Sequence, residues 1–234
     1  MKRLSIIIAA CLVVMVTTIF AQNCGNYIPL KANSGYEMQD FKANGKLTGT
    51  AKTTINSVAT NAGATIANVT QESTDDKGKS QGKTDYTIKC NGTSLSIDMK
   101  AMMNPQSNDA YKDMQVSFTS TDLDVPSTIT VGSTLKDASM TMTVVNNGVT
   151  FSEMKIDIIN RKVVSQESIT TPLGTFNCYK ISYDCNMVTK TMGFPMNVNT
   201  KAVQYMCADK GVIKSEVYND KGTLMSYSLM SKVF

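Results

Sequence analysis

Residues 139–158 read SMTMTVVNNGVTFSEMKIDI, and this stretch decides the fold class. An apolar residue recurs at every second position before Asn147-Gly148, and the alternation returns over residues 154–158. A period of two with one apolar face is typical of a half-buried antiparallel strand. Asn-Gly between two such runs is a strong hairpin signal, because both residues tolerate positive φ. We therefore predict a β-hairpin here.

The same pattern of strand-like runs and glycine-containing turns fills most of the chain. Six such turns occur, at Asn44-Gly45, residues 76–78, Asn91-Gly92, Asn147-Gly148, residues 209–211 and residues 220–222. Together they predict an all-β fold, an antiparallel meander of about ten to twelve strands. We expect these strands to form a curved sheet, an open or half-closed barrel. One short helical turn is expected over Asn104 to Lys112.

A weak division separates two runs of hairpins, at residues 34–120 and 134–234. The segment from Asp122 to Gly132 is short and partly apolar, so it predicts a crossing within one sheet better than a linker. We therefore expect residues 22–234 to form a single antiparallel β domain.

Residues 1–21 have the pattern of a secretory signal peptide. Lys2 and Arg3 precede a nearly unbroken apolar run, and Ala21 offers a small residue at the cleavage point. A retained membrane anchor is the alternative, but no basic stop-transfer cluster follows the run. The expected location is the periplasm, or the secreted or cell-surface fraction.

Charge argues against nucleic acid as a partner. The chain has 23 basic and 19 acidic residues, and removal of Lys2 and Arg3 leaves 21 against 19, a net charge of +2. Nucleic-acid binding needs a concentrated basic surface, and no run of five like charges occurs.

Cysteine usage suits an oxidising compartment. Beyond the leader the chain keeps an odd number of cysteines, so at least one thiol is free or pairs between molecules. We expect Cys24 to pair with Cys90, and Cys207 to pair with either Cys178 or Cys185. The spacing does not resemble a zinc site, and the chain has no histidine.

Catalytic patterns are weak. Without histidine, the Ser-His-Asp and Cys-His arrangements are excluded. Two acid pairs remain, Asp122 with Asp124 and Asp85 with Asp98, and each is better interpreted as part of a solvated strand face or a turn. Cys178 lies in a strand with only Lys180 nearby, which favours a structural cysteine. We expect no catalytic residue, no metal and no cofactor.

Methionine is the most informative residue type. Fourteen methionines follow the leader, and Met102, Met103, Met140 and Met142 stand out as candidate ligand-binding residues. Methionine is flexible and polarizable, so it builds adaptable apolar surfaces. Simple filling of the sheet's apolar face and ligation of Cu(I) are the alternatives, and the copper interpretation is the weaker.

Two stretches carry a resemblance to a known family. Residues 171–176 (TPLGTF) with residues 178–180 (CYK), and the closing segment from Lys210 to Gly222, resemble the TapB-like secreted proteins of Bacteroidota. The early residues 24–29 and 44–47 are similar as well. Relatives often carry a tryptophan near Tyr205, and this chain has none. The resemblance implies an exported β-sheet protein of uncharacterised activity, a half-barrel like the lipoprotein carriers, and no catalytic residues.

These observations favour a non-catalytic envelope protein that holds a hydrophobic ligand or partner on a concave apolar sheet. The alternative is a structural accessory of a cell-envelope complex that binds protein through its sheet edges. The expected partners are a lipid-like ligand or an envelope protein, with a peripheral membrane association at most.

Overall fold

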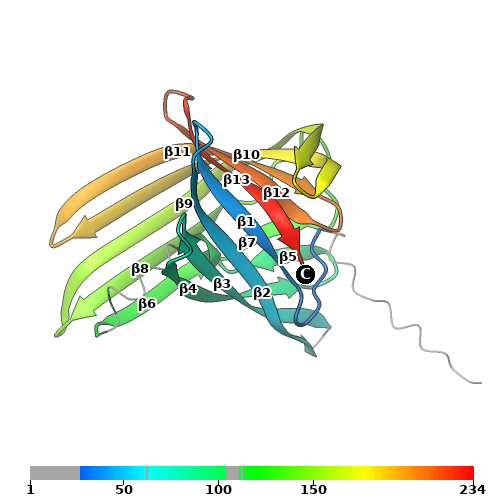
Figure 1. The fold of residues 1–234 in the computed structure, drawn as a ribbon. Coiled ribbons are helices and arrows are strands. Elements are labelled where there is room, and N and C mark those ends of the chain that lie inside the picture. Colours follow the sequence, from blue (N-terminus) through cyan, green and yellow to red (C-terminus); the bar gives the residue numbers. More distant parts are fainter. Residues whose placement is uncertain (1–26, 62, 104–110, 112) are drawn as a thin grey trace, which may run out of the picture.

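The computed structural model describes residues 27–61, 63–103, 111 and 113–234. One antiparallel sheet of thirteen strands curves into a nearly closed barrel (Figure 1). The strands are β1 (Gly35–Lys42), β2 (Leu47–Asn61), β3 (Ala64–Asp75), β4 (Ser80–Cys90), β5 (Ser94–Ile97), β6 (Gln115–Thr121), β7 (Leu123–Pro126), β8 (Ala138–Asn146), β9 (Val149–Thr171), β10 (Gly174–Thr191), β11 (Phe194–Cys207), β12 (Gly211–Asn219) and β13 (Leu224–Val233). The predicted fold class is confirmed.

All six predicted turns join strands or end them, and the glycine of each has a φ of 73–83°. The strand count exceeds the predicted range because residues 115–126 divide into two strands, β6 and β7. Most of the segment expected to form a helical turn, residues 104–112, lies outside the described residues. A 3-10 helix, η1 (Met99–Met102), precedes that segment and begins at Asp98, whose side chain accepts a hydrogen bond from the Lys100 amide.

The sheet order explains why the barrel is not fully closed. The order is β6-β8-β9-β10-β11-β12-β13-β1-β2-β3-β4-β5-β7, so β6 and β7 form opposite edges although only Asp122 separates them in sequence. The chain therefore crosses the gap between the two edges, which we call the seam. The predicted crossing segment from Asp122 to Gly132 begins at this point.

Arg161 of β9 joins the elements that border the seam. Its side chain is 3% exposed, and its Nη1 donates to the carbonyl oxygens of Asp124 at 2.8 Å and Lys136 at 2.5 Å. Backbone hydrogen bonds add to this contact: the Leu135 amide donates to the Arg161 carbonyl, and the Val163 amide donates to the Ser133 carbonyl. The connection after β7 is thereby held against β9.

The sheet extends beyond the barrel on one side. We call this extension the wing; it consists of β6, β8, the first half of β9, the second half of β10 and the first half of β11, residues 115–121, 138–159 and 184–200. It projects on the left in Figure 1. β12 pairs with β11 only from Thr200 onward, so residues 194–199 continue past the end of β12.

The described residues form three apolar clusters, the third of which includes Cys178, Cys207, Ile213 and Met230. The first lies within the barrel and includes Ile88, Leu95, Val125, Val163 and Ile181. The second lies under the wing and is rich in methionine. The predicted leader, residues 1–21, and Cys24 lie outside the described residues. Within the part of the chain that is described, no helix has the length and apolar character to cross a membrane.

Candidate functional site

The barrel contains a partly open cavity of about 330 Å³. Strands from both halves of the sequence, together with η1, contribute to its wall. The cavity therefore exists only because the sheet curves round and brings these strands to face one another. Its apolar lining residues are Ile28, Met38, Ile88, Ile97, Ala101, Met102, Leu123, Val125, Ala202, Met206, Val212 and Val217. The volume lies at the lower end of the range of about 300–1,000 Å³ for small-molecule sites, and such sites are mostly apolar.

Polar groups occupy part of the same wall. Gln71, Gln204, Ser215 and the buried Arg161 line the cavity, as do three tyrosines, Tyr36, Tyr86 and Tyr183. Two further charged residues, Lys210 and Glu216, also border it. Burial raises the pKa of each tyrosine, so the phenols are neutral at physiological pH. Burial lowers the pKa of Arg161 from its ordinary value, while Tyr183, Asp124 and Asp137 oppose that shift. The lining therefore combines an apolar surface with a few hydrogen-bonding groups.

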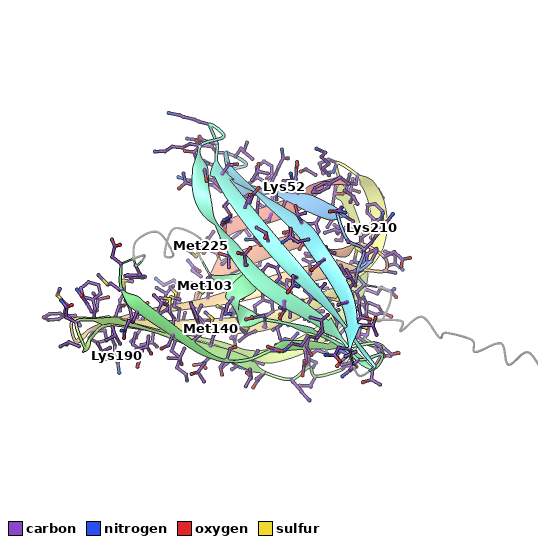
Figure 2. The ribbon with its side chains drawn as sticks, turned by 90° about the horizontal axis from the view of Figure 1, so that it is seen from below. Lys52, Met103, Met140, Lys190, Lys210 and Met225 are labelled. Carbon is purple, nitrogen blue, oxygen red and sulfur yellow. A yellow bond between two sulfur atoms is a disulfide. The ribbon has the colours of Figure 1, made fainter. Side chains whose placement is uncertain are left out.

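The four predicted ligand-binding methionines fall into two environments. Met103, Met140 and Met142 are buried in the apolar cluster under the wing rather than in the wall of the cavity. Met102 is 37% exposed and lines the cavity. Figure 2 shows Met103 and Met140 close together at the junction of wing and barrel. Three of the four thus fill a packed core, one of the alternatives considered above, and a role in ligand binding stays a prediction.

The inner face of the wing is mainly apolar, with serine or threonine at several positions of β9 and β10. Residues directly opposite one another in an antiparallel pair have their side chains on the same face. One row of such partners, from β6 to β11, runs Phe118, Met142, Met154, Thr189, Met196. The next row toward the wing's end runs Val116, Val144, Ser152, Thr191, Phe194.

Only the middle of this face is covered. Met142 and Val144 are buried, whereas Phe118, Met196 and Phe194 at its two margins are exposed. Alternate positions along β11 place Phe194, Met196 and Val198 on the same face as the cavity-lining Ala202 and Gln204. The cavity lining and the apolar face of the wing are therefore one continuous surface, which sequence periodicity alone does not reveal because it depends on the register of five strands.

The candidate acid pairs have structural partners. Asp122 pairs with Lys89 at 3.4 Å, and Asp124 accepts a hydrogen bond from Ser96. Asp98 caps η1, and Asp85 accepts from Thr70. Among the described residues, no group of three or more His, Cys, Asp or Glu side chains is arranged to hold a metal ion.

A denser polar cluster lies on β11 and β12. Glu216 accepts from Tyr218 at 2.8 Å and from Tyr205 at 3.2 Å, and pairs with Lys214 at 2.6 Å. Burial alone would raise the pKa of Glu216, but these three partners outweigh it and the pKa is lowered. Burial and the neighbouring carboxylate raise the pKa of Tyr218 to about 12. The shifts follow from a satisfied network in which Lys214 and Tyr218 come from the same strand as Glu216, at alternate positions, and Tyr205 comes from the neighbouring β11.

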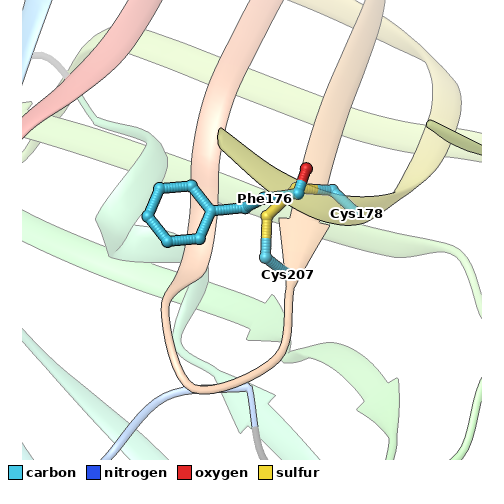
Figure 3. Close-up of a disulfide and its surroundings, with 3 residues drawn as sticks. All are labelled: Phe176, Cys178 and Cys207. Atoms are coloured by element: carbon cyan, nitrogen blue, oxygen red, sulfur yellow. A yellow bond between two sulfur atoms is a disulfide. The ribbon is translucent and has the colours of Figure 1, made fainter. Parts of the chain in front are cut away.

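The cysteines have distinct roles. Cys178 and Cys207 are directly opposite on β10 and β11 and form a disulfide (Figure 3), one of the two pairings expected for Cys207. Cys185 is a free thiol, and burial raises its pKa. Cys90 is buried and disulfide-bonded. Its predicted partner, Cys24, lies outside the described residues.

Known proteins resemble this chain in fold. A structure from Bacteroides fragilis NCTC 9343, described as a "putative exported protein with YmcC-like fold", has a TM-score of 0.69 at 19% identity, with 89% of this chain and 98% of that one covered. A "putative lipoprotein" from Parabacteroides distasonis ATCC 8503 has a TM-score of 0.68 at 17% identity, with the same coverage. Among curated proteins no significant match is found. The DUF3108-like family matches residues 32–230, most of the chain, and the protein therefore belongs to the DUF3108-like family.

Proposed function

We propose that this protein is an exported, non-catalytic binding protein that holds a hydrophobic, lipid-like ligand in its barrel. The observation that carries the proposal is the cavity of about 330 Å³, walled mainly by apolar side chains and continuous with the apolar face of the wing. A polar hollow lined by residues such as Asn56, Lys83 and Asp98 is larger, at about 390 Å³, so the proposal rests on the apolar lining and its continuity with the wing rather than on the volume.

The polar part of the wall suits a ligand with one polar end. Gln71, Gln204 and Ser215 supply neutral hydrogen-bonding groups, and Arg161 supplies a cation. A few placed polar groups in an apolar pocket fix a ligand's orientation. An acyl chain with a polar or anionic head combines the two chemistries.

Export is supported by two independent features. Residues 1–21 have the pattern of a leader, and the two similar structures are described as an exported protein and a lipoprotein. Assignment to the periplasm or the cell surface, and to the TapB-like proteins within this fold, is part of the proposal. The intact mass of the protein recovered from the envelope fraction tests whether residues 1–21 are removed.

A binding assay on delipidated protein tests the ligand. A fluorescent fatty-acid analogue is titrated against the wild type and against Ala202→Phe, in which the added ring occupies space in the cavity. We expect the variant to bind at least about tenfold more weakly, since the ring displaces part of the acyl chain.

Two further variants separate filling of the cavity from general damage. Ala101→Phe fills the cavity from η1 instead of β11, and Ala59→Phe adds the same ring at an exposed position of β2. The proposal predicts that Ala101→Phe weakens binding and Ala59→Phe does not. Binding that is unchanged in both filled variants, with the fold intact by circular dichroism, would contradict it.

A second candidate function is that of an accessory protein that binds other proteins through its sheet edges. β6 ends the sheet on one side, and all seven of its side chains are exposed and uncharged. Edge strands commonly carry charges that prevent pairing, so this composition favours strand addition by a partner. A Ser117→Pro variant removes one backbone donor from β6, and loss of a co-purifying envelope protein would support this function.

A further inference from the structure

The end of the wing exposes large apolar side chains. Phe194 is 80% exposed, Met192 is 70% exposed and Met196 is 58% exposed, and all three lie at or beside the turn that joins β10 and β11. Val149 is exposed at the start of β9, in the adjacent hairpin. Thr191 pairs directly with Ser152, so the two hairpin ends lie side by side. Contiguous exposed apolar groups of this kind mark an interaction site.

The same region is free of charge. Residues 114–121, 141–152 and 191–200 contain no Asp, Glu, Lys or Arg. These 30 residues would carry about five charged side chains at the chain's overall charged fraction of 18%. On β10 this charge-free stretch begins after the exposed Lys190, which lies directly opposite Pro195 and Glu153, whereas Lys201 lies opposite Asp184 at the base of the wing.

The charged residues that flank the tip lie on the opposite face from its apolar residues. Lys190 and Lys201 occupy the alternate positions of β10 and β11 from Thr189 and Met196. Figure 2 shows Lys190 at the far end of the wing, away from the barrel. The tip therefore combines an uncharged apolar face with one basic and one acidic side chain, Lys190 and Glu153, on its other face.

We propose that the tip of the wing inserts into the surface of a lipid bilayer. Membrane-surface binding scales with the apolar area that is buried and gains from basic residues near anionic head groups. The apolar component dominates here: the exposed apolar side chains are outermost, and Lys190 lies behind them. The inference does not depend on a ligand in the cavity.

Backbone hydrogen bonding limits the depth of insertion. Residues 194–199 extend past the end of β12, so the outer edge of this part of β11 faces away from the sheet. Unpaired backbone groups are not tolerated in the hydrocarbon core, but water and head groups satisfy them at its boundary. We therefore place the tip at the depth of the head groups and the first part of the acyl chains.

The chain contains no tryptophan, which makes a direct test available. Phe194→Trp introduces a single indole at the tip, and Met225→Trp introduces one at a comparably exposed site beside the β12–β13 turn, away from the wing. Each purified, processed protein is mixed with phosphatidylcholine vesicles that contain a minority of phosphatidylglycerol. We expect the indole emission of the Phe194→Trp variant to shift to shorter wavelength and to be quenched by brominated lipids, with no change for Met225→Trp.

A flotation assay with the same vesicles measures affinity. Phe194→Thr and Met196→Thr replace apolar side chains by a residue that favours strands, and we expect each to weaken binding about tenfold. Met225→Thr is the matched control and should bind as the wild type does. Higher salt should weaken binding only slightly, since Lys190, which lies opposite Glu153, contributes a small part of the attraction.

Two outcomes would overturn the proposal. An unshifted Phe194→Trp spectrum at saturating vesicle concentration would show that the tip does not enter lipid. A shift that appears without vesicles and grows with protein concentration would show instead that the tip binds a second copy of the chain.

Discussion

Replacement of Arg161 by methionine should weaken the contacts that hold together the elements bordering the seam. The guanidinium donates to two backbone carbonyls, those of Asp124 and Lys136, and its side chain is almost fully buried. Methionine has a similar length and no donor, so both carbonyls would lose their partner in a buried environment. Each unsatisfied group costs about 1–3 kcal/mol.

The net loss in the free energy of unfolding is smaller than the sum of the costs of the two unsatisfied carbonyls. Removal of the buried guanidinium also removes the desolvation penalty that lowers its pKa, which offsets part of the loss. We therefore expect Arg161→Met to reduce the free energy of unfolding by about 2–4 kcal/mol. Arg161→Lys, which keeps the charge but not the planar fork, should lose roughly half as much.

Urea unfolding measures the total, and hydrogen exchange measures its location. The expected signature is faster exchange of the Leu135 and Val163 amides, which bond across the same junction, with little change in β2 and β3. Lys162→Met, at the exposed neighbouring position, is the control. Equal stability of Arg161→Met and Lys162→Met, or a uniform change in exchange, would refute the role of Arg161 in holding the seam.

Three further predictions concern stability. Alanine at both Cys178 and Cys207 opens a disulfide that spans 29 residues, and should lower the free energy of unfolding by about 3 kcal/mol under oxidising conditions, with no difference from the wild type in reductant. Glu216→Gln should lower the free energy of unfolding by about 1 kcal/mol at neutral pH. Because the pKa of Glu216 is lowered in the folded state, its stabilising contribution is present above the ordinary glutamate pKa and is lost as the pH falls through the folded-state pKa. The wild type and the variant should therefore have the same stability in acid. Met140→Ala should cost about 2–5 kcal/mol in urea unfolding, whereas Met102→Ala, at a partly exposed cavity wall, should cost less than about 1 kcal/mol; similar costs would contradict the two environments assigned to these methionines.

Local patterns in the sequence were sufficient for the fold class. Asn147-Gly148 and the alternation around it predicted the β8–β9 hairpin, because turn conformation and strand periodicity are set by neighbouring residues. The Met192-Gly193 turn was not predicted. Both residues adopt positive φ there. Because methionine rarely does so, the sequence lacks the Asn-Gly or similar dipeptide that usually indicates such a turn.

Long-range features could not be predicted in the same way. The sequence places Met102 and Met103 together, yet one lines the cavity and the other is buried under the wing, since adjacent residues at the end of η1 point in different directions. No local pattern singles out Arg161, because its two acceptors lie 37 and 25 residues away in the chain. The cavity depends on the register of strands from both halves of the sequence, and no local sequence pattern predicts that register.

Native mass spectrometry of the exported protein, isolated from its own envelope without delipidation, tests the central claim most directly. We predict a reproducible added mass that organic solvent extracts as a lipid-like compound, and that is absent or strongly reduced in Ala202→Phe but retained in Ala59→Phe. A bare polypeptide mass in the wild type, even after incubation with envelope lipids, would contradict the claim that this barrel holds a hydrophobic ligand.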